Sequence, residues 1–116
     1  MKIGVAFSGS GAGAGIAYLL TGDYETVAHT IVNALAVVSG IVCDGAKPSC
    51  AAKIASSVDA GILGFEMYRR GRQFYGGDGI VSKGIENTIR NVGELGRDGM
   101  RETDRKILQI MTRSQA

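Results

Sequence analysis

Glycine is the residue that most constrains how this chain can fold. The sequence has 18 glycines among 116 residues, and four of them, Gly9, Gly11, Gly13 and Gly15, alternate with serine and alanine in the stretch GSGAGAG. Residues this small lower helix propensity, but they let a neighbouring backbone approach closely. The stretch therefore predicts a helix that packs against other helices at short distance.

The same stretch has a second interpretation, as a dinucleotide-binding turn. Gly9-x-Gly11-x-x-Ala14 fits the fingerprint G-x-G-x-x-G/A, and the preceding KIGVAF has the composition of a strand. The acidic residue expected about 20 positions later is missing. Asp23 comes too early and Asp44 too late. The sequence thus favours close helix packing over nucleotide binding.

Apolar residues recur at helical spacing through the rest of the chain. We expect a helix from about residue 24 with Asp23 as its N-cap, a helix from Pro48 to about residue 70 that stops at Gly71, and two more after a loop at 73–82. The expected apolar stripes are Val27, Ile31, Leu35 and Val38; Ile54, Val58, Ile62 and Phe65; Ile85, Ile89, Val92 and Leu95; and Met100, Ile107, Ile110 and Met111. Because no alternating strand pattern persists, we predict a single all-α domain of about five helices over residues 1–116.

Composition and charge argue against several functions. The hydrophobic fraction of 45% supports a packed core, and a net charge of +2 with interspersed signs gives no basic patch for nucleic acid. The amino-terminal stretch is too rich in glycine and serine for a signal peptide, and residues 30–43 are fewer than the roughly 20 needed to span a bilayer. We therefore expect a soluble, cytoplasmic protein whose cysteines are thiols or metal ligands rather than a disulfide.

The two cysteines flank one turn. Six residues separate Cys43 from Cys50, and they include the Asp44-Gly45 pair and the only proline. This gap is too wide for the usual zinc motif, and the lone histidine, His29, lies well upstream. An iron–sulfur cluster needs more than two thiolate ligands. From spacing alone, buried structural thiols are favoured.

Other polar groups have a solvated and a functional interpretation. Asp44, Lys47 and Lys53 form either a solvated helix entry or an anion-binding helix start. The charged residues at 97–105 form a solvated helix face or, because glycines lie beside them, the edge of a site. His29 fits an ordinary, partly buried histidine better than a ligand or base.

Three long stretches resemble one known family. They are CDGAKPSCAAKIA, GIENTIRNVGELGRDGMRETDRKILQIM and GAGAGIAYLLTGDYETVAHTIVNALAVVSGIVCDGAK. Together they resemble the carboxy-terminal portion of the serine dehydratase-like alpha family, in its L-cysteine desulfidase branch (UPF0597-type proteins). The resemblance extends over about residues 11–111. It implies that residues 1–116 form the carboxy-terminal portion of a larger catalytic domain.

The resemblance implies a lyase. Members of the family use an oxygen-sensitive [4Fe–4S] cluster as a Lewis acid for α,β-elimination of L-cysteine or L-serine, which yields pyruvate and ammonia, with sulfide from cysteine. By position, Cys43 is implied as the metal ligand and Cys50 as a second, weaker cofactor-binding candidate. Asp44 and Lys47 are implied as catalytic-site residues.

The chain also departs from the family pattern. Relatives are several times longer and carry further cluster cysteines, so we expect this chain to be a fragment, a separately encoded half or a degenerate copy. We expect it to be inactive alone, to associate with a missing amino-terminal half or a second copy, and not necessarily to hold the cluster itself. The alternative hypothesis is a non-catalytic helical assembly module that has lost the cluster.

Overall fold

The chain folds into helices throughout the part that the structure describes. The structure is a computed structural model, and it describes residues 4–42 and 48–114. The elements are α1 (Gly4–Thr21), α2 (Tyr24–Val38), α3 (Pro48–Arg69), α4 (Ile85–Glu94), the π-helix η1 (Leu95–Gly99) and α5 (Arg101–Ser114). No strand occurs within these residues, which confirms the predicted all-α class with about five helices.

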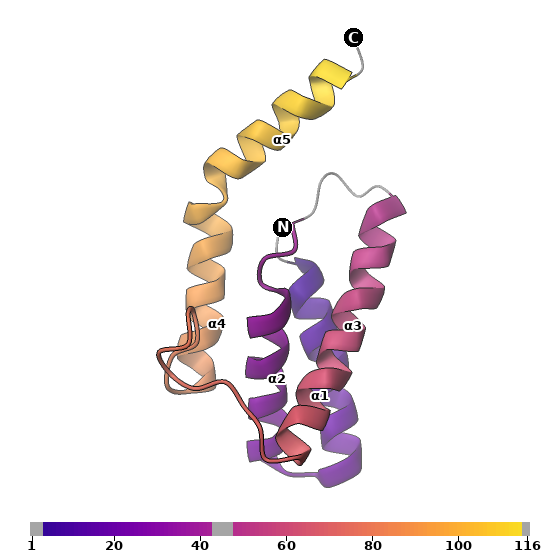
Figure 1. Ribbon diagram of the computed structural model, residues 1–116, viewed down its shortest axis with the longest axis vertical. Coiled ribbons are helices and arrows are strands. Elements are labelled where there is room, and N and C mark those ends of the chain that lie inside the picture. The colour runs from indigo at the N-terminus through magenta and orange to yellow at the C-terminus, as the bar shows by residue number, and fades with distance from the viewer. Residues whose placement is uncertain (1–3, 43–47, 115–116) are drawn as a thin grey trace.

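Helices α1, α2 and α3 form an antiparallel bundle (Figure 1). The amino-terminal ends of α1 and α3 and the carboxy-terminal end of α2 lie at one end of this bundle. Asp23 caps α2 as predicted, because its Oδ2 accepts hydrogen bonds from Thr26 N at 3.2 Å and from Thr26 Oγ1 at 2.8 Å. Pro48 opens α3, also as predicted.

Glycine makes the contact between α1 and α3 possible. Gly9 lies against Ser57, and Gly13 lies against Gly61, where an added Cβ on Gly13 would sit 2.6 Å from the Gly61 Cα. On the other side of α3, a Cβ on Gly64 would sit 2.8 Å from the backbone oxygen of Thr30 in α2. Real Cβ atoms do not approach other atoms this closely, so the three backbones pack as the glycine pattern predicted.

The dinucleotide interpretation of the same stretch is wrong. Gly9, Gly11 and Ala14 lie in the interior of α1, and the described part of KIGVAF is the first turn of that helix rather than a strand. A dinucleotide fingerprint needs its glycines in a turn at a helix N-terminus, where free N–H groups meet the pyrophosphate. Inside a helix those N–H groups are already hydrogen-bonded.

The apolar core centres on α2. Leu35, Val38, Ala60 and Val92 are almost fully buried, and they are surrounded by the partly buried Ile31, Ile41, Ile80 and Ile89. The predicted apolar stripe of α2 is therefore confirmed at Leu35 and Val38. The same core draws α4 against α2 through Val92.

The predicted stripe of α3 is wrong at two of its four positions. Ile54 is 45% exposed and Ile62 is 41% exposed, although Phe65 is buried. The buried face consists mainly of small residues: Cys50, Ser57, Ala60, Gly61, Gly64 and Phe65. Small residues allow the close backbone contacts with α1 and α2, and the larger aliphatic side chains are turned outward as a result.

The loop between α3 and α4 is held in place by hydrogen bonds from side chains of α4. Gly71 has a φ of 75° and its N–H bonds to Tyr68 O at 2.9 Å, which ends α3 as predicted. Thr88 of α4 both donates to Ser82 O and accepts from Ser82 N through its Oγ1, at 3.0 and 3.1 Å. Asn91 adds bonds to Ile80 O and Ser82 Oγ at 2.9 and 2.7 Å.

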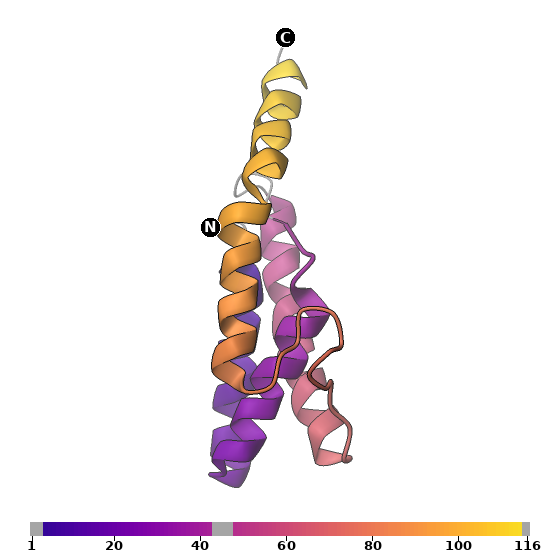
Figure 2. The same cartoon turned by 90° about the vertical axis from the view of Figure 1, so that its left-hand side faces the viewer.

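The carboxy-terminal arm leaves the bundle. After α4 the chain passes through η1, where Gly96 and Gly99 lie, and then forms α5. Among the described helices α5 contacts only η1, and it extends beyond the bundle in both views (Figures 1 and 2). The molecule is accordingly elongated, measuring 52 × 27 × 16 Å.

Candidate functional site

The predicted site lies at the turn between α2 and α3. Cys43, Asp44 and Lys47 fall in the segment 43–47, outside the residues that the structure describes. Of the predicted site residues, only Cys50 is described. It lies in the first turn of α3 and is 8% exposed, so its thiol is directed into the bundle rather than to the surface.

Well-packed elements flank this turn on both sides. Before it, Ile41 packs against the core and its N–H bonds to Val38 O at 3.1 Å. After it, α3 starts at Pro48 with no acidic residue in its first turn, and Lys53 follows in the second turn. The positive end of the helix dipole lies at this end of α3, which favours an anionic group there.

The described residues do not by themselves fit an iron–sulfur cluster. No group of three or more His, Cys, Asp or Glu side chains within the described ranges is arranged to hold a metal. Cys50 is the single thiol among them, and a cluster needs more thiolates than that. Any cluster at this end of the bundle therefore needs ligands from outside the described residues.

A pocket lies at the opposite end of the bundle, where α2 and α4 begin. It has a volume of about 330 Å³ and is lined by Tyr24, Glu25, Ala28, His29, Gly84, Ile85 and Glu86. The His29 ring stacks on Tyr68 with a centroid separation of 4.5 Å and an interplanar angle of 9°. Its Nε2 is 3.6 Å from Glu25 Oε2, and the side chain is 30% exposed. His29 is thus partly buried, as expected, and it lies far from the Cys50 end.

Asn33 is a buried polar residue that sequence reasoning missed. Its side chain has no exposed surface. The Nδ2 donates to Gly64 O at 3.1 Å, and the Oδ1 accepts from Phe74 N at 3.1 Å. One amide therefore joins α2, α3 and the following loop. The available signal was a second, polar stripe on α2, formed by Thr26, Thr30 and Asn33 at helical spacing, all three of which are buried.

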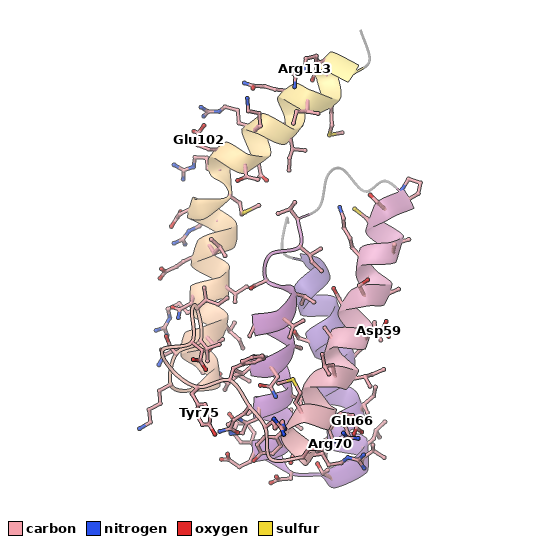
Figure 3. The ribbon with its side chains drawn as sticks, in the orientation of Figure 1. Asp59, Glu66, Arg70, Tyr75, Glu102 and Arg113 are labelled. Carbon is pink, nitrogen blue, oxygen red and sulfur yellow. The ribbon has the colours of Figure 1, made fainter. Side chains whose placement is uncertain are left out.

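The charged residues at 97–105 form a solvated surface. Arg97 Nε is 3.2 Å from Asp98 Oδ1, and Arg105 Nη1 is 3.1 Å from Glu102 Oε1. The Arg97 hydrogen bond lowers the pKa of Asp98 below its usual range, and the same contact raises the pKa of Arg97. All four side chains are exposed, as Glu102 on the outer arm illustrates (Figure 3). The solvated interpretation is confirmed for these four side chains, whereas Asp104 is half-buried and its Oδ1 is buried without a hydrogen-bond partner among the described residues.

None of the described helices is both long enough and apolar enough to cross a membrane.

Comparison with known proteins identifies relatives along nearly the whole chain. The family model described as serine dehydratase alpha chain matches residues 2–109. A UPF0597 protein of Desulfitobacterium hafniense (strain Y51) is 69% identical over 108 residues, which cover 93% of this chain and 25% of that protein. A UPF0597 protein of Finegoldia magna is 50% identical over 108 residues, covering 93% of this chain and 26% of that protein.

More distant relatives show the same coverage. A UPF0597 protein of Bacteroides fragilis (strain YCH46) is 38% identical over 109 residues, covering 94% of this chain and 26% of that protein. The chain thus spans about a quarter of the length of the curated relatives that it matches. No solved structure matches it.

Proposed function

Because the chain belongs to the serine dehydratase alpha chain family, we propose that it is the carboxy-terminal portion of an iron–sulfur-dependent amino acid lyase. The proposed reaction is α,β-elimination of L-cysteine or L-serine to pyruvate and ammonia, with sulfide released from cysteine. The observation that carries the proposal is the family match over residues 2–109, which includes the segment with both cysteines.

The length of the relatives decides what this chain contributes. It spans about a quarter of them, so the substrate, the cluster and the complete active site belong to a longer polypeptide or to an assembly of chains. An alpha-chain family also suggests a partner subunit. We therefore assign this chain a supporting role: it holds one turn of the site, and it is inactive alone.

Individual residues receive proposed roles on the family pattern. Cys43 is proposed as the iron ligand and Cys50 as a second, weaker candidate. Asp44 and Lys47 are proposed to contact the substrate. A bound [4Fe–4S] cluster would supply a Lewis acid for the leaving group. Since the described residues do not hold such a cluster by themselves, no step of the elimination is assigned to them.

The fold supports this role through the packed residues on either side of 43–47. Ile41 packs into the core on one side, and Cys50 is buried in α3 on the other. A site keeps its geometry better when the residues around it are fixed by packing. The start of α3 also suits an anionic ligand, such as a substrate carboxylate.

A hybrid protein tests the proposal. In it, this chain replaces the matching quarter of the Desulfitobacterium hafniense relative, and the unaltered relative serves as the positive control. After anaerobic incubation with iron and sulfide, we expect the broad visible absorbance of an iron–sulfur cluster and release of pyruvate from L-serine or L-cysteine. The Cys43→Ser hybrid should lose both.

Cys50→Ser is the matched thiol substitution. Retention of the cluster in that hybrid assigns the ligand role to Cys43 alone, and loss in both assigns it to both cysteines. A folded hybrid that gains no cluster while the unaltered relative does would reject the role of this chain. A relative that gains no cluster and makes no pyruvate would reject the lyase class.

A further inference from the structure

Helix α1 has two glycine faces, and only one of them is used within the chain. Gly9 and Gly13 face α3, where Ser57 and Gly61 approach at backbone distance. Gly11 and Gly15 lie on the opposite face of the helix. Both are exposed, and an added Cβ on either would meet nothing within 4 Å. The inner face, with Gly9 and Gly13, therefore shows how closely a helix can pack on a glycine surface. The outer face, with Gly11 and Gly15, is not covered by any described residue.

The outer face is also unsuited to lasting contact with water. The 18 residues of α1 include no charged side chain. Near its carboxy-terminal end, Tyr18 is 65% exposed and Leu19 is 83% exposed. Most of the charged residues of the chain follow Glu66, so this lack of charge is local. A helix without a polar face is usually buried in the complete protein.

The neighbouring helix α3 carries charge at Lys53 and Asp59 but also exposes small and aliphatic residues. Ala51, Ala52 and Ala55 are exposed on it, and Ile62 and Leu63 are 41% and 48% exposed. Asp59, which points away from α2, is the single acidic residue of α3 before Glu66 (Figure 3). Small and aliphatic residues are typical of surfaces between packed helices rather than of solvated helix faces.

The length of the relatives indicates what covers this surface. About three quarters of each relative lies outside the match, and that polypeptide is available to cover this surface. Close backbone contact over glycines at a spacing of four residues selects a helix as the partner, as α3 demonstrates on the inner face.

We propose that the outer face of α1, centred on Gly11 and Gly15 and ending at Tyr18 and Leu19, is the docking surface for an uncharged helix. That helix belongs to the portion of a serine dehydratase-type polypeptide that this chain does not span. The proposal rests on the chain being part of that longer assembly, but it does not depend on the lyase reaction or on the cluster.

One substitution measured in two settings tests the docking surface. In the isolated chain, Gly15→Leu should raise the melting temperature, because the position is exposed and leucine favours helix more than glycine does. In the hybrid with the Desulfitobacterium hafniense relative, the same substitution should lower the melting temperature, because the leucine would separate α1 from the docked helix. The expected result is thus a rise in melting temperature in the isolated chain and a fall in the hybrid.

Gly93→Leu is the matched control. Gly93 is an exposed helical glycine with nothing within 4 Å of an added Cβ, and it shares a helix face with the charged Glu86, Arg90 and Arg97. This change should raise the melting temperature or leave it unchanged in both settings. If the Gly15→Leu hybrid fails to fold while the Gly93→Leu hybrid folds, the smaller Gly15→Ala should still lower the melting temperature of the hybrid.

Two outcomes would overturn the proposal. A rise in melting temperature for Gly15→Leu in both settings would show that nothing packs on this face. A dimer of the isolated wild-type chain in light scattering that becomes a monomer on Gly15→Leu would assign the face to a second copy instead. Neither measurement involves iron, sulfide or pyruvate, so failure here is separable from failure of the proposed function.

Discussion

Gly61 illustrates, at the scale of single residues, how closely this fold is packed. An added Cβ there would collide with the α1 backbone at Gly9 and Gly13. Unlike a crowded side chain, a helix backbone cannot change rotamer to make room. The collision is therefore relieved only by moving α1 away from α3, which also loosens the contacts around it.

We predict that Gly61→Ala destabilises the chain. Overpacking of this kind costs about 1–3 kcal/mol in the free energy of unfolding. The control is Gly93→Ala, an exposed helical glycine with open space, which should gain up to about 1 kcal/mol from improved helix propensity. Urea denaturation followed by circular dichroism measures both. Equal gains for the two variants would mean that α1 and α3 are not in backbone contact.

Replacing Asn33 should weaken the contact between α2, α3 and the loop that follows α3. Asn33→Ala leaves Gly64 O and Phe74 N without their side-chain partner in a buried region. We expect a loss of about 1–3 kcal/mol in the free energy of unfolding. The exposed Asn87, whose side chain bonds to Lys83 O and Arg90, is the control, and Asn87→Ala should stay within about 0.5 kcal/mol.

Amide hydrogen exchange adds a local measurement to the Asn33 prediction. The Phe74 N–H should exchange faster in Asn33→Ala than in the wild type, because its acceptor is gone. Unchanged protection at Phe74 would contradict the role given to Asn33.

At the scale of single residues, the sequence predicted the features that depend on local conformational preference, namely where helices begin and end. Asp23 as a cap, Pro48 as a helix start and Gly71 as a helix stop follow from the conformational preferences of each residue, and all three are confirmed. Asn33 could not be found in this way, because its partners lie 31 and 41 positions away. A buried amide is recognisable only when the elements around it are already placed.

At the scale of elements, α5 differs from the rest of the structure. None of its described side chains is buried, and it contacts only η1 among the described helices. Helices of this length have little stability without tertiary contacts. We therefore treat α5 as an arm that follows the bundle rather than as part of its core.

We predict that a chain ending at Met100 keeps the stability of the bundle. Its melting temperature should fall by no more than a few degrees, and its helical signal should decrease by the share of α5. A chain ending at Lys83 is the contrast, because it also loses the fully buried Val92 and should melt at a much lower temperature. A large fall for the first truncation would show that α5 supports the core.

Helical periodicity predicted the existence of these elements better than their orientation. The apolar stripe of α2 is buried at Leu35 and Val38, yet Ile54 and Ile62 of α3 are half-exposed. The periodicity rule assumes that large apolar residues face inward. In α3 the close approach of α1 selects small residues for the interior, and this reverses the assignment. The π-helix at 95–99 had only a weak signal, the glycines at every third position.

At the scale of the whole molecule, the fold class and the family could be predicted, but the site could not be completed. The all-α class is confirmed, and so is the resemblance to the serine dehydratase alpha chain family. The roles of Cys43, Asp44 and Lys47 stay predictions, because the structure does not describe them. On the proposed function the site also draws on polypeptide outside this quarter, and such a site cannot be assembled from one quarter.

The backbone contact between α1 and α3 also fixes their register. Sliding α3 along α1 by one helical turn would bring either Ala17 to the place of Gly13 or Phe65 to the place of Gly61, and in each case the new Cβ would collide with the facing backbone. Main-chain atoms have no alternative rotamers through which such a slip could be absorbed. The contact therefore blocks a slip by one turn in either direction, and the height at which α3 begins relative to α1 is fixed to within one turn. The residues before Pro48, to which the proposed function assigns the site, are joined to a helix whose position this contact fixes.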